Sequence, residues 1–310
     1  MEHYLRLQEN IKKGGDLMLL GAIEAGGTKF VCAIGKENGE ILERVSFPTT
    51  TPEETMGKVV EFFKDKEIEA LGVGSFGPVD LDKSSKTYGY ITSTPKKGWT
   101  NYNILGELKK HFDLPINFDT DVNGAALGEA KWGAGKGLDS VLYLTVGTGI
   151  GGGIYSGGRL IHGMTHPETG HILVRRQEGD NYPGKCPYHG DCLEGMASGP
   201  AIEERWGVKA YELEKNHKAW ELEGYYLAQG LVNYILIVSP KKIILGGGVM
   251  KQEQLFPLIR KKVVEMLNGY VPHKNILENI DEYIVPPKLG DNAGICGSLA
   301  LAMEGEMKEI

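Results

Sequence analysis

The sequence predicts an α/β protein built from two related halves. Short β-rich runs joined by glycine-containing turns occur twice, and helical stretches follow each set. The chain also holds 44 glycines in 310 residues, whereas an average usage of about 7% would give roughly 22. Such an excess indicates many tight turns and places where the backbone comes close to a ligand.

The first half begins with three β-rich runs at residues 19–27, 28–36 and 41–47, which predict an antiparallel meander. Further predicted elements are a helix over 51–64, buried strands over 70–75 and 115–118, and a helix over 121–132.

The second half repeats this theme with strands predicted over 141–146 and 151–161 around a glycine-rich turn. Helices over 219–238, 252–268 and 292–303 and a strand over 242–247 complete it. We place the boundary near Asn123, because the pattern restarts after the helix that follows. The expected division is an extension over 1–17, a first lobe of 18–123 plus 291–310, and a second lobe of 124–290.

Composition excludes several classes of protein. With 41% hydrophobic and 24% charged residues the chain is globular, and a net charge of −7 disfavours a nucleic-acid surface. Residues 140–158 carry no charge and reach membrane-span length, but seven of them are glycine, which favours a hairpin over a membrane helix. The N-terminal residues show no signal peptide, so we expect a cytoplasmic protein without a membrane partner.

Three glycine-rich turns are candidates for binding phosphate. They lie at 24–29, 145–153 and 246–249, and each closes a predicted strand. The first fits neither a Walker loop nor a dinucleotide fingerprint, and a strand rather than a helix follows the second. Each turn alone could be an ordinary hairpin. Because backbone N–H groups and threonine hydroxyls in such turns converge on anions, the three together predict a triphosphate held between the halves.

Cysteine and histidine gather in one short segment. His171 is followed, after 14 intervening residues, by the pattern Cys186-x-x-His189-x-x-Cys192. Four such ligands can close a tetrahedral structural Zn²⁺ site, and in a reducing compartment the cysteines are better metal ligands than disulfide partners. The alternative is surface histidines beside unpaired cysteines. The spacing does not fit a nucleic-acid-binding finger.

Asp121 follows a predicted strand and opens a predicted helix. Two interpretations remain open from the residues alone. Aspartate is a preferred N-cap residue, so Asp121 could cap this helix. A carboxylate at a strand end beside a phosphate site could also act as a general base.

The ordered motifs resemble those of the ROK family of sugar kinases, and more narrowly its bacterial fructokinase branch, from about residue 18 to 303. The resemblance implies a two-lobed, actin-like (ribonuclease H-like) ATPase fold with its active site in the cleft between the lobes. Glu24 stands where most members have aspartate. ATP, bound with Mg²⁺, would contact the residues of the three turns: Gly26, Gly27, Thr28, Lys29, Gly147, Thr148, Gly149, Gly246, Gly247 and Gly248.

The same resemblance implies roles for the other residues. Asp121 would be the catalytic base, and the sugar would contact Thr94, Glu168, His171 and Glu194. The family's zinc would be held by His171, Cys186, His189 and Cys192, with His189 standing where the family has a cysteine. Thr120 occupies the place of a sugar-contacting asparagine in glucose- and amino-sugar-specific members, which favours fructose.

The predicted activity is therefore ATP-dependent phosphorylation of a hexose, most simply fructose to fructose 6-phosphate. A kinase for glucose, mannose or an amino sugar is the alternative. A non-catalytic sugar-sensing repressor is disfavoured, because only 23 residues precede Glu24. The resemblance also implies a homodimer.

Overall fold

The computed structural model describes residues 18–304, so the extension expected over 1–17 lies outside the described part of the chain. The described residues form two compact units. Unit 1 takes 18–132, 162–166 and 291–304, and unit 2 takes 133–161 and 167–290.

Unit 1 is built on a five-stranded mixed sheet in the order β3-β2-β1-β4-β7. Strands β1, β2 and β3 form the expected antiparallel meander, and β1, β4 and β7 run parallel. Their bounds are β1 Leu19–Ala25, β2 Lys29–Lys36, β3 Ile41–Pro48, β4 Ala70–Ser75 and β7 Ile116–Thr120.

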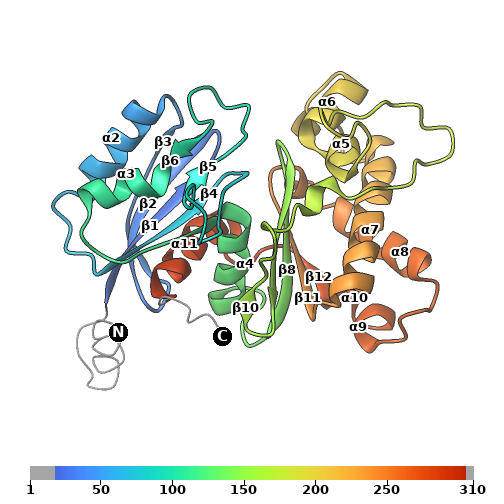
Figure 1. Ribbon diagram of the computed structural model, residues 1–310. Helices are drawn as coiled ribbons and strands as arrows, with labels where there is room; N and C mark the ends of the chain where they lie inside the picture. The colour runs from blue at the N-terminus through green and yellow to red at the C-terminus, as the bar shows by residue number, and fades with distance from the viewer. Residues whose placement is uncertain (1–17, 305–310) are drawn as a thin grey trace. The chain divides into compact units, whose positions relative to one another are not determined.

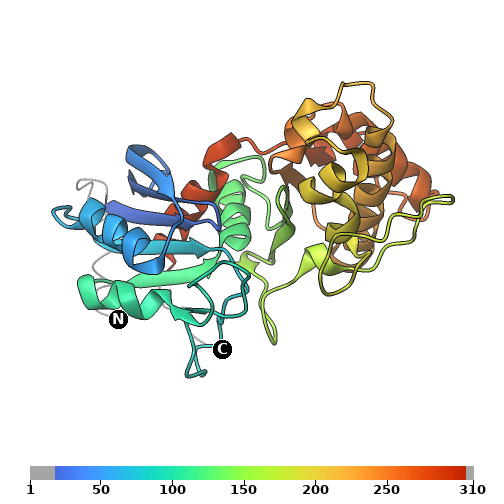
Figure 2. The same ribbon diagram turned by 90° about the horizontal axis from the view of Figure 1, so that it is seen from above.

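Helices cover both faces of this sheet (Figures 1 and 2). On one face, α2 (Pro52–Phe63) and α3 (Ile104–His111) bury their apolar residues against β1 and β2, with the two-stranded β5 (Tyr90–Ile91) and β6 (Tyr102–Asn103) beside them. On the other face, α11 (Ala293–Met303) packs against β1 and β4 and against α4 (Asp121–Trp132). Each face therefore has its own apolar core.

Unit 2 is built on a second five-stranded sheet in the order β10-β9-β8-β11-β12. Its strands are β8 Ser140–Val146, β9 Ile150–Ser156, β10 Arg159–Leu160, β11 Lys242–Gly246 and β12 Ile284–Val285. The uncharged stretch over 140–158 is the antiparallel β8–β9 hairpin, as predicted. Among the described residues, no helix combines the length and apolarity that crossing a bilayer requires.

One apolar core joins this sheet to the helices of unit 2, among which α7 packs along α8. The helices are α5 Leu193–Ala197, α6 Gly199–Trp206, α7 Ala219–Val238, α8 Leu255–Leu267, α9 Lys274–Leu277 and α10 Ile280–Tyr283. Short 3₁₀ turns lie at η1 Thr169–His171, η2 Ala210–Glu212, η3 Val249–Lys251 and η4 Gly290–Asn292.

Among the predicted elements and boundaries, one strand and the boundary between the halves differ from the sequence-based expectation. The strand expected over 151–161 is two strands, because Gly157 and Gly158 both adopt positive φ and reverse the chain between β9 and β10. The boundary expected near Asn123 falls inside α4. This helix stays with unit 1 because it packs against α11, and the chain changes unit at Gly133.

Candidate active site and metal cluster

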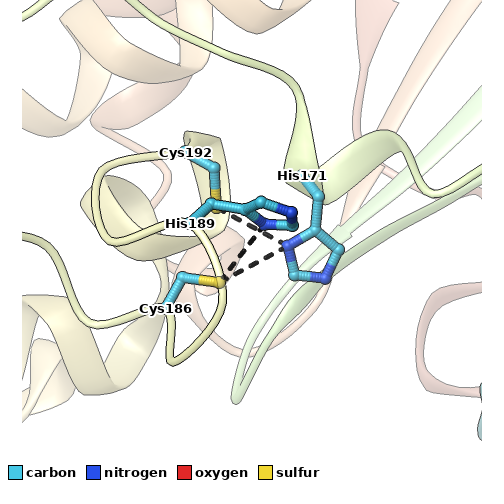
Figure 3. Close-up of side chains that lie close together, drawn as sticks. All are labelled: His171, Cys186, His189 and Cys192. Atoms are coloured by element: carbon cyan, nitrogen blue, oxygen red, sulfur yellow. Dashed lines mark hydrogen bonds between the residues drawn. The ribbon is translucent and has the colours of Figure 1, made fainter.

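The four predicted metal ligands lie together in unit 2. Figure 3 shows the side chains of His171, Cys186, His189 and Cys192 converging, and their ligand atoms all lie within 4.8 Å of one another. The Nδ1 atom of His171 lies 3.7 Å from Cys186 Sγ and 3.5 Å from Cys192 Sγ, and His189 Nδ1 lies 3.6 Å from Cys186 Sγ.

These separations fit a tetrahedral ion. Zn–S bonds of about 2.3 Å and Zn–N bonds of about 2.0–2.1 Å place sulfur and nitrogen about 3.6 Å apart at a tetrahedral angle. Cys186 and Cys192 are buried thiols, and burial raises the pKa of Cys192 to about 11. A metal ion at this place would take up both sulfurs as thiolates, with release of their protons. All four cysteines of the chain are free, and none forms a disulfide.

The backbone closes the loop around the cluster. Cys186 and Gly190 exchange two backbone hydrogen bonds of 3.2 and 3.0 Å, so His189 lies at the tip of a tight turn. Cys192 pairs with Leu173 in an isolated bridge, and Arg176 forms an ion pair of 2.9 Å with Asp191. The two ends of the segment are thus held side by side without a regular strand.

The cluster is linked to the second glycine turn through Glu194. Its Oε1 lies 4.0 Å from Nε2 of His171, and its Oε2 accepts a hydrogen bond of 2.9 Å from the backbone N–H of Ile150. Ile150 is also in close contact with Gly170: a Cβ atom added to Gly170 would lie 1.8 Å from the carbonyl oxygen of Ile150. Only glycine allows η1 to approach β9 so closely, and the metal loop thereby holds the start of β9 from both sides.

The second and third glycine turns are neighbours within unit 2. Strands β8 and β11 pair in parallel, so that Gly147 and Gly248 follow adjacent strand ends. Gly247 has φ of +92°, and a Cβ atom there would lie 2.3 Å from the carbonyl oxygen of Val146. The N–H of Gly199, the first residue of α6, donates to the carbonyl oxygen of Gly147 at 2.7 Å. Thr148 and Gly248 are exposed, and their backbone is open to a ligand.

The first glycine turn lies in unit 1 between β1 and β2. Gly26 N–H donates to the carbonyl oxygen of Lys29 at 3.0 Å, and Thr28 and Lys29 are exposed at the tip. Beneath the turn, burial raises the pKa of Glu24 against the opposing charge of Lys29, and its buried Oε2 has no hydrogen-bond partner among residues 18–304. A buried carboxylate oxygen in this position fits a cation or its bound water.

The structure rules out one of the two interpretations of Asp121, that of the helix cap. Helix α4 is capped by Thr120, whose Oγ1 accepts the N–H of Asn123 at 3.0 Å. The Asp121 carboxylate instead accepts the N–H of its neighbour Val122 at 2.9 Å. Asp121 is therefore not the N-cap. Thr120 is 3% exposed and its hydroxyl is occupied by the cap, so its side chain is turned into the protein.

The two remaining predicted sugar contacts lie on loops. Thr94, in unit 1, is half-buried and accepts the N–H of Lys96 at 3.3 Å. This loop is anchored by the buried Trp99, whose Nε1 donates to the carbonyl oxygen of Thr50 at 2.8 Å. Glu168, in unit 2, is exposed and directly precedes η1, where its carbonyl oxygen accepts the N–H of His171.

In unit 2, contacts connect the four cluster residues through Glu194 to the turn at 147–149, which lies beside the turn at 246–248. Unit 1 contains the turn at 24–29, Thr94 and Asp121. Neither the Glu194–Ile150 bond nor the ion pair between Asp119 and His162, which lie 43 positions apart, could be predicted from the sequence, because no local pattern links the partners.

The chain is similar to known proteins along nearly its whole length. The model of the ROK family matches residues 20–305. A relative from Bacillus subtilis is 57% identical over 94% of this chain and 97% of its own length. A fructokinase of Pediococcus pentosaceus is 48% identical over 92% of this chain and 98% of its own. The crystal structure of a ROK family glucokinase from Streptomyces griseus in complex with glucose and AMPPNP superimposes with a TM-score of 0.74 at 26% identity, covering 93% and 100% of the two chains.

Proposed function

Because the chain belongs to the ROK family, we propose that it is an ATP-dependent fructokinase, which converts fructose to fructose 6-phosphate. The predicted family and the predicted α/β, actin-like fold class are both confirmed. The observation that carries the proposal is the similarity to fructokinases along nearly the whole chain.

The transfer needs a base and a cradle for the phosphates. Asp121 would accept the proton of the sugar 6-hydroxyl while the oxygen of that hydroxyl attacks the γ-phosphorus of ATP. The bond between the γ-phosphorus and the β-phosphate oxygen breaks, and ADP leaves. The glycine turns at 26–29 and 147–149 would direct N–H groups to the phosphates, with Gly246 to Gly248 on the adenosine side. Mg²⁺, when bound with ATP, supplies positive charge for the phosphates, and the buried Glu24 is the residue that fits it.

The residues proposed to contact the sugar are Thr94, Glu168, His171 and Glu194. His171 Nδ1 points into the metal cluster, which leaves its Nε2 for the sugar side. The cluster has four protein ligands and no open position, the arrangement of a structural Zn²⁺ site. The ion would fix a loop that has no regular structure of its own, so that the carboxylates of Glu168 and Glu194 keep their places.

A kinase for another hexose is the second candidate, favoured by the likeness to the Streptomyces griseus glucokinase. Thr120 favours fructose, because its hydroxyl caps α4 and supplies no amide to a pyranose. We further propose that the protein is cytoplasmic and forms a homodimer. Light scattering on the purified protein would test the oligomeric state.

A coupled ADP-release assay over fructose, glucose, mannose and N-acetylmannosamine tests the activity. We expect kcat/KM for fructose to exceed that for each other sugar. A higher kcat/KM for glucose or mannose would make that sugar, rather than fructose, the assigned substrate. Hexose binding without ADP release would contradict the proposed kinase activity. Mass spectrometry of the product would identify the phosphorylated position.

A further inference from the structure

The segment 162–166 departs from the chain around it. Strand β10 before it and Pro167 after it belong to unit 2, whereas these five residues belong to unit 1. Two histidines anchor its ends. His162 Nε2 lies 2.8 Å from Asp119 Oδ2, and Nε2 of His166 accepts the backbone N–H of Val79 at 3.3 Å. Between them, Met164 is 97% exposed.

The two histidines have opposite proton roles. His162 must carry a proton on Nε2, because a carboxylate only accepts hydrogen bonds. His166 must lack one on Nε2, because that atom accepts an N–H. The hydrogen bond to Asp119, more than the charge of Asp119, raises the pKa of His162 against the opposing effect of burial.

Asp119, which binds His162, also forms hydrogen bonds with the turn that carries Asp121. Its Oδ1 accepts the N–H of Thr120 at 2.7 Å and the side-chain amide of Asn123 at 2.7 Å, while Oδ2 takes His162. Asp119 is 5% exposed and Asn123 is 1% exposed. Asp121 therefore lies between Thr120 and Asn123, which are both hydrogen-bonded to the buried carboxylate of Asp119.

We propose that His162 is a positioning residue for the transfer reaction, which holds Asp119 and through it the turn that carries Asp121. The inference rests on the proposed function, in which Asp121 is the base. Without His162, Oδ2 of Asp119 loses its partner, and a buried carboxylate in that state favours a rearranged turn or the uptake of a proton. Either change moves Asp121 or alters the charge two residues before it. Tyr88 also interacts with Asp119: burial, and less strongly this carboxylate, raise its pKa.

Three variants test this role. His162→Phe keeps the ring and removes the donor, and His162→Gln keeps an N–H donor without the charge. His111→Phe makes the same change in an exposed histidine of α3, which lies 3.4 Å from Glu107. We expect His162→Phe to lower kcat with fructose about 10- to 100-fold, as small misplacements of a catalytic group do, with KM for ATP changed less than about 2-fold. His162→Gln should recover most of kcat, and His111→Phe should match the wild type.

A second measurement needs no turnover. Amide hydrogen exchange at Thr120, Val122 and Asn123 should be about 10-fold faster or more in His162→Phe than in His111→Phe. By NMR, the titration of His162 should lie above the ordinary histidine value of about 6.5 and fall back in Asp119→Asn.

The outcomes separate the two proposals. A wild-type protein that phosphorylates no hexose contradicts the proposed function, and the exchange rates then decide on His162 alone. An active wild type with a His162→Phe variant within about 2-fold of its kcat overturns the positioning role. Unchanged exchange at the three amides, or equal losses in the Phe and Gln variants, overturns it as well.

Discussion

The carboxylate of Glu194 accepts the backbone N–H of Ile150 at 2.9 Å, and this bond joins the metal loop to the hairpin of the second glycine turn. The two residues lie 44 positions apart along the chain. Through this contact the cluster of His171, Cys186, His189 and Cys192 is connected to the first residue of β9, directly after Gly149. In the proposed site the same cluster would support both Glu194 and the second glycine turn.

Replacing Cys192 by serine should empty the metal site, because a serine hydroxyl is a poor zinc ligand at neutral pH. Wild-type protein purified without chelator should hold about one zinc per chain by elemental analysis, and the variant much less. By calorimetry, fructose affinity should fall most, and ATP affinity should fall by a smaller factor because of the Glu194 contact. Cys296→Ala, a buried thiol in unit 1, is the control. Wild-type protein without zinc, or a variant with full fructose affinity, would contradict the site.

Replacing Glu194 by alanine removes the acceptor of the Ile150 N–H. A hydrogen bond to a charged acceptor contributes about 1.5–3 kcal/mol, so the free energy of unfolding in urea should fall by about that amount. Glu204→Ala is the matched control, since its ion pair with Lys185 is exposed and such pairs contribute about 0–1 kcal/mol. Equal effects of the two changes would show that the Ile150 bond has no special value.

Replacing Gly170 by alanine tests the other side of the same contact. The added Cβ would lie 1.8 Å from the carbonyl oxygen of Ile150, so η1 or β9 must shift. Overpacking of this kind costs about 1–3 kcal/mol or more. Gly163→Ala, where the nearest atom lies 3.9 Å away, should leave urea unfolding nearly unchanged. A Gly170→Ala protein as stable as Gly163→Ala would mean that the two segments are not in close contact.

Asp121→Asn should lower turnover by at least the ~10²-fold that accompanies loss of a general base. The asparagine keeps the size of the side chain and can still accept the N–H of Val122. Since Thr120 caps α4, folding and ATP affinity should stay near the wild-type values. Steady-state kinetics with fructose, together with calorimetry of ATP binding, would measure both. Turnover near the wild-type rate would remove Asp121 from the mechanism.

The His162–Asp119 pair predicts a pH dependence of stability. The pKa of His162 is raised in the folded protein above its ordinary value of about 6.5. Its contribution to the free energy of unfolding is therefore complete below about pH 6.5 and is lost as the pH rises through the folded pKa. Urea unfolding of the wild type and of His162→Phe would be measured between about pH 5.5 and about pH 8.5. The free energies of unfolding of the two proteins should converge as the pH rises. A difference that grows with pH would contradict the assignment.

Regular elements with strong local signals could be predicted from the sequence. The bounds of α4 and α7 agree with prediction because each follows or precedes a clear break in the apolar pattern. Helix α3 was missed although Asn103 caps it and Ile104, Leu105 and Leu108 form its buried side. Its eight residues give only two turns of periodicity, too short to separate from a loop.

The site could be predicted only where its residues are close in sequence. The four predicted metal ligands lie within one segment of 22 residues, and the structure brings their side chains together. The choice between Thr120 and Asp121 as the cap of α4 could not be made, because both residue types cap helices well and they are adjacent. The contacts of Glu194 with Ile150 and of His162 with Asp119 depend on tertiary packing, which local patterns do not record.

The position of α11 has a consequence for how the chain is made. This helix covers the face of the unit 1 sheet formed by Leu20, Ala22 and Val31, and its Ser298 Oγ accepts the N–H of Gly74 on β4. On the ribosome, the strands of that sheet emerge first, and α11 emerges only after the whole of unit 2 has been synthesised. An apolar sheet face therefore stays uncovered for most of translation, the situation in which nascent chains depend on chaperones.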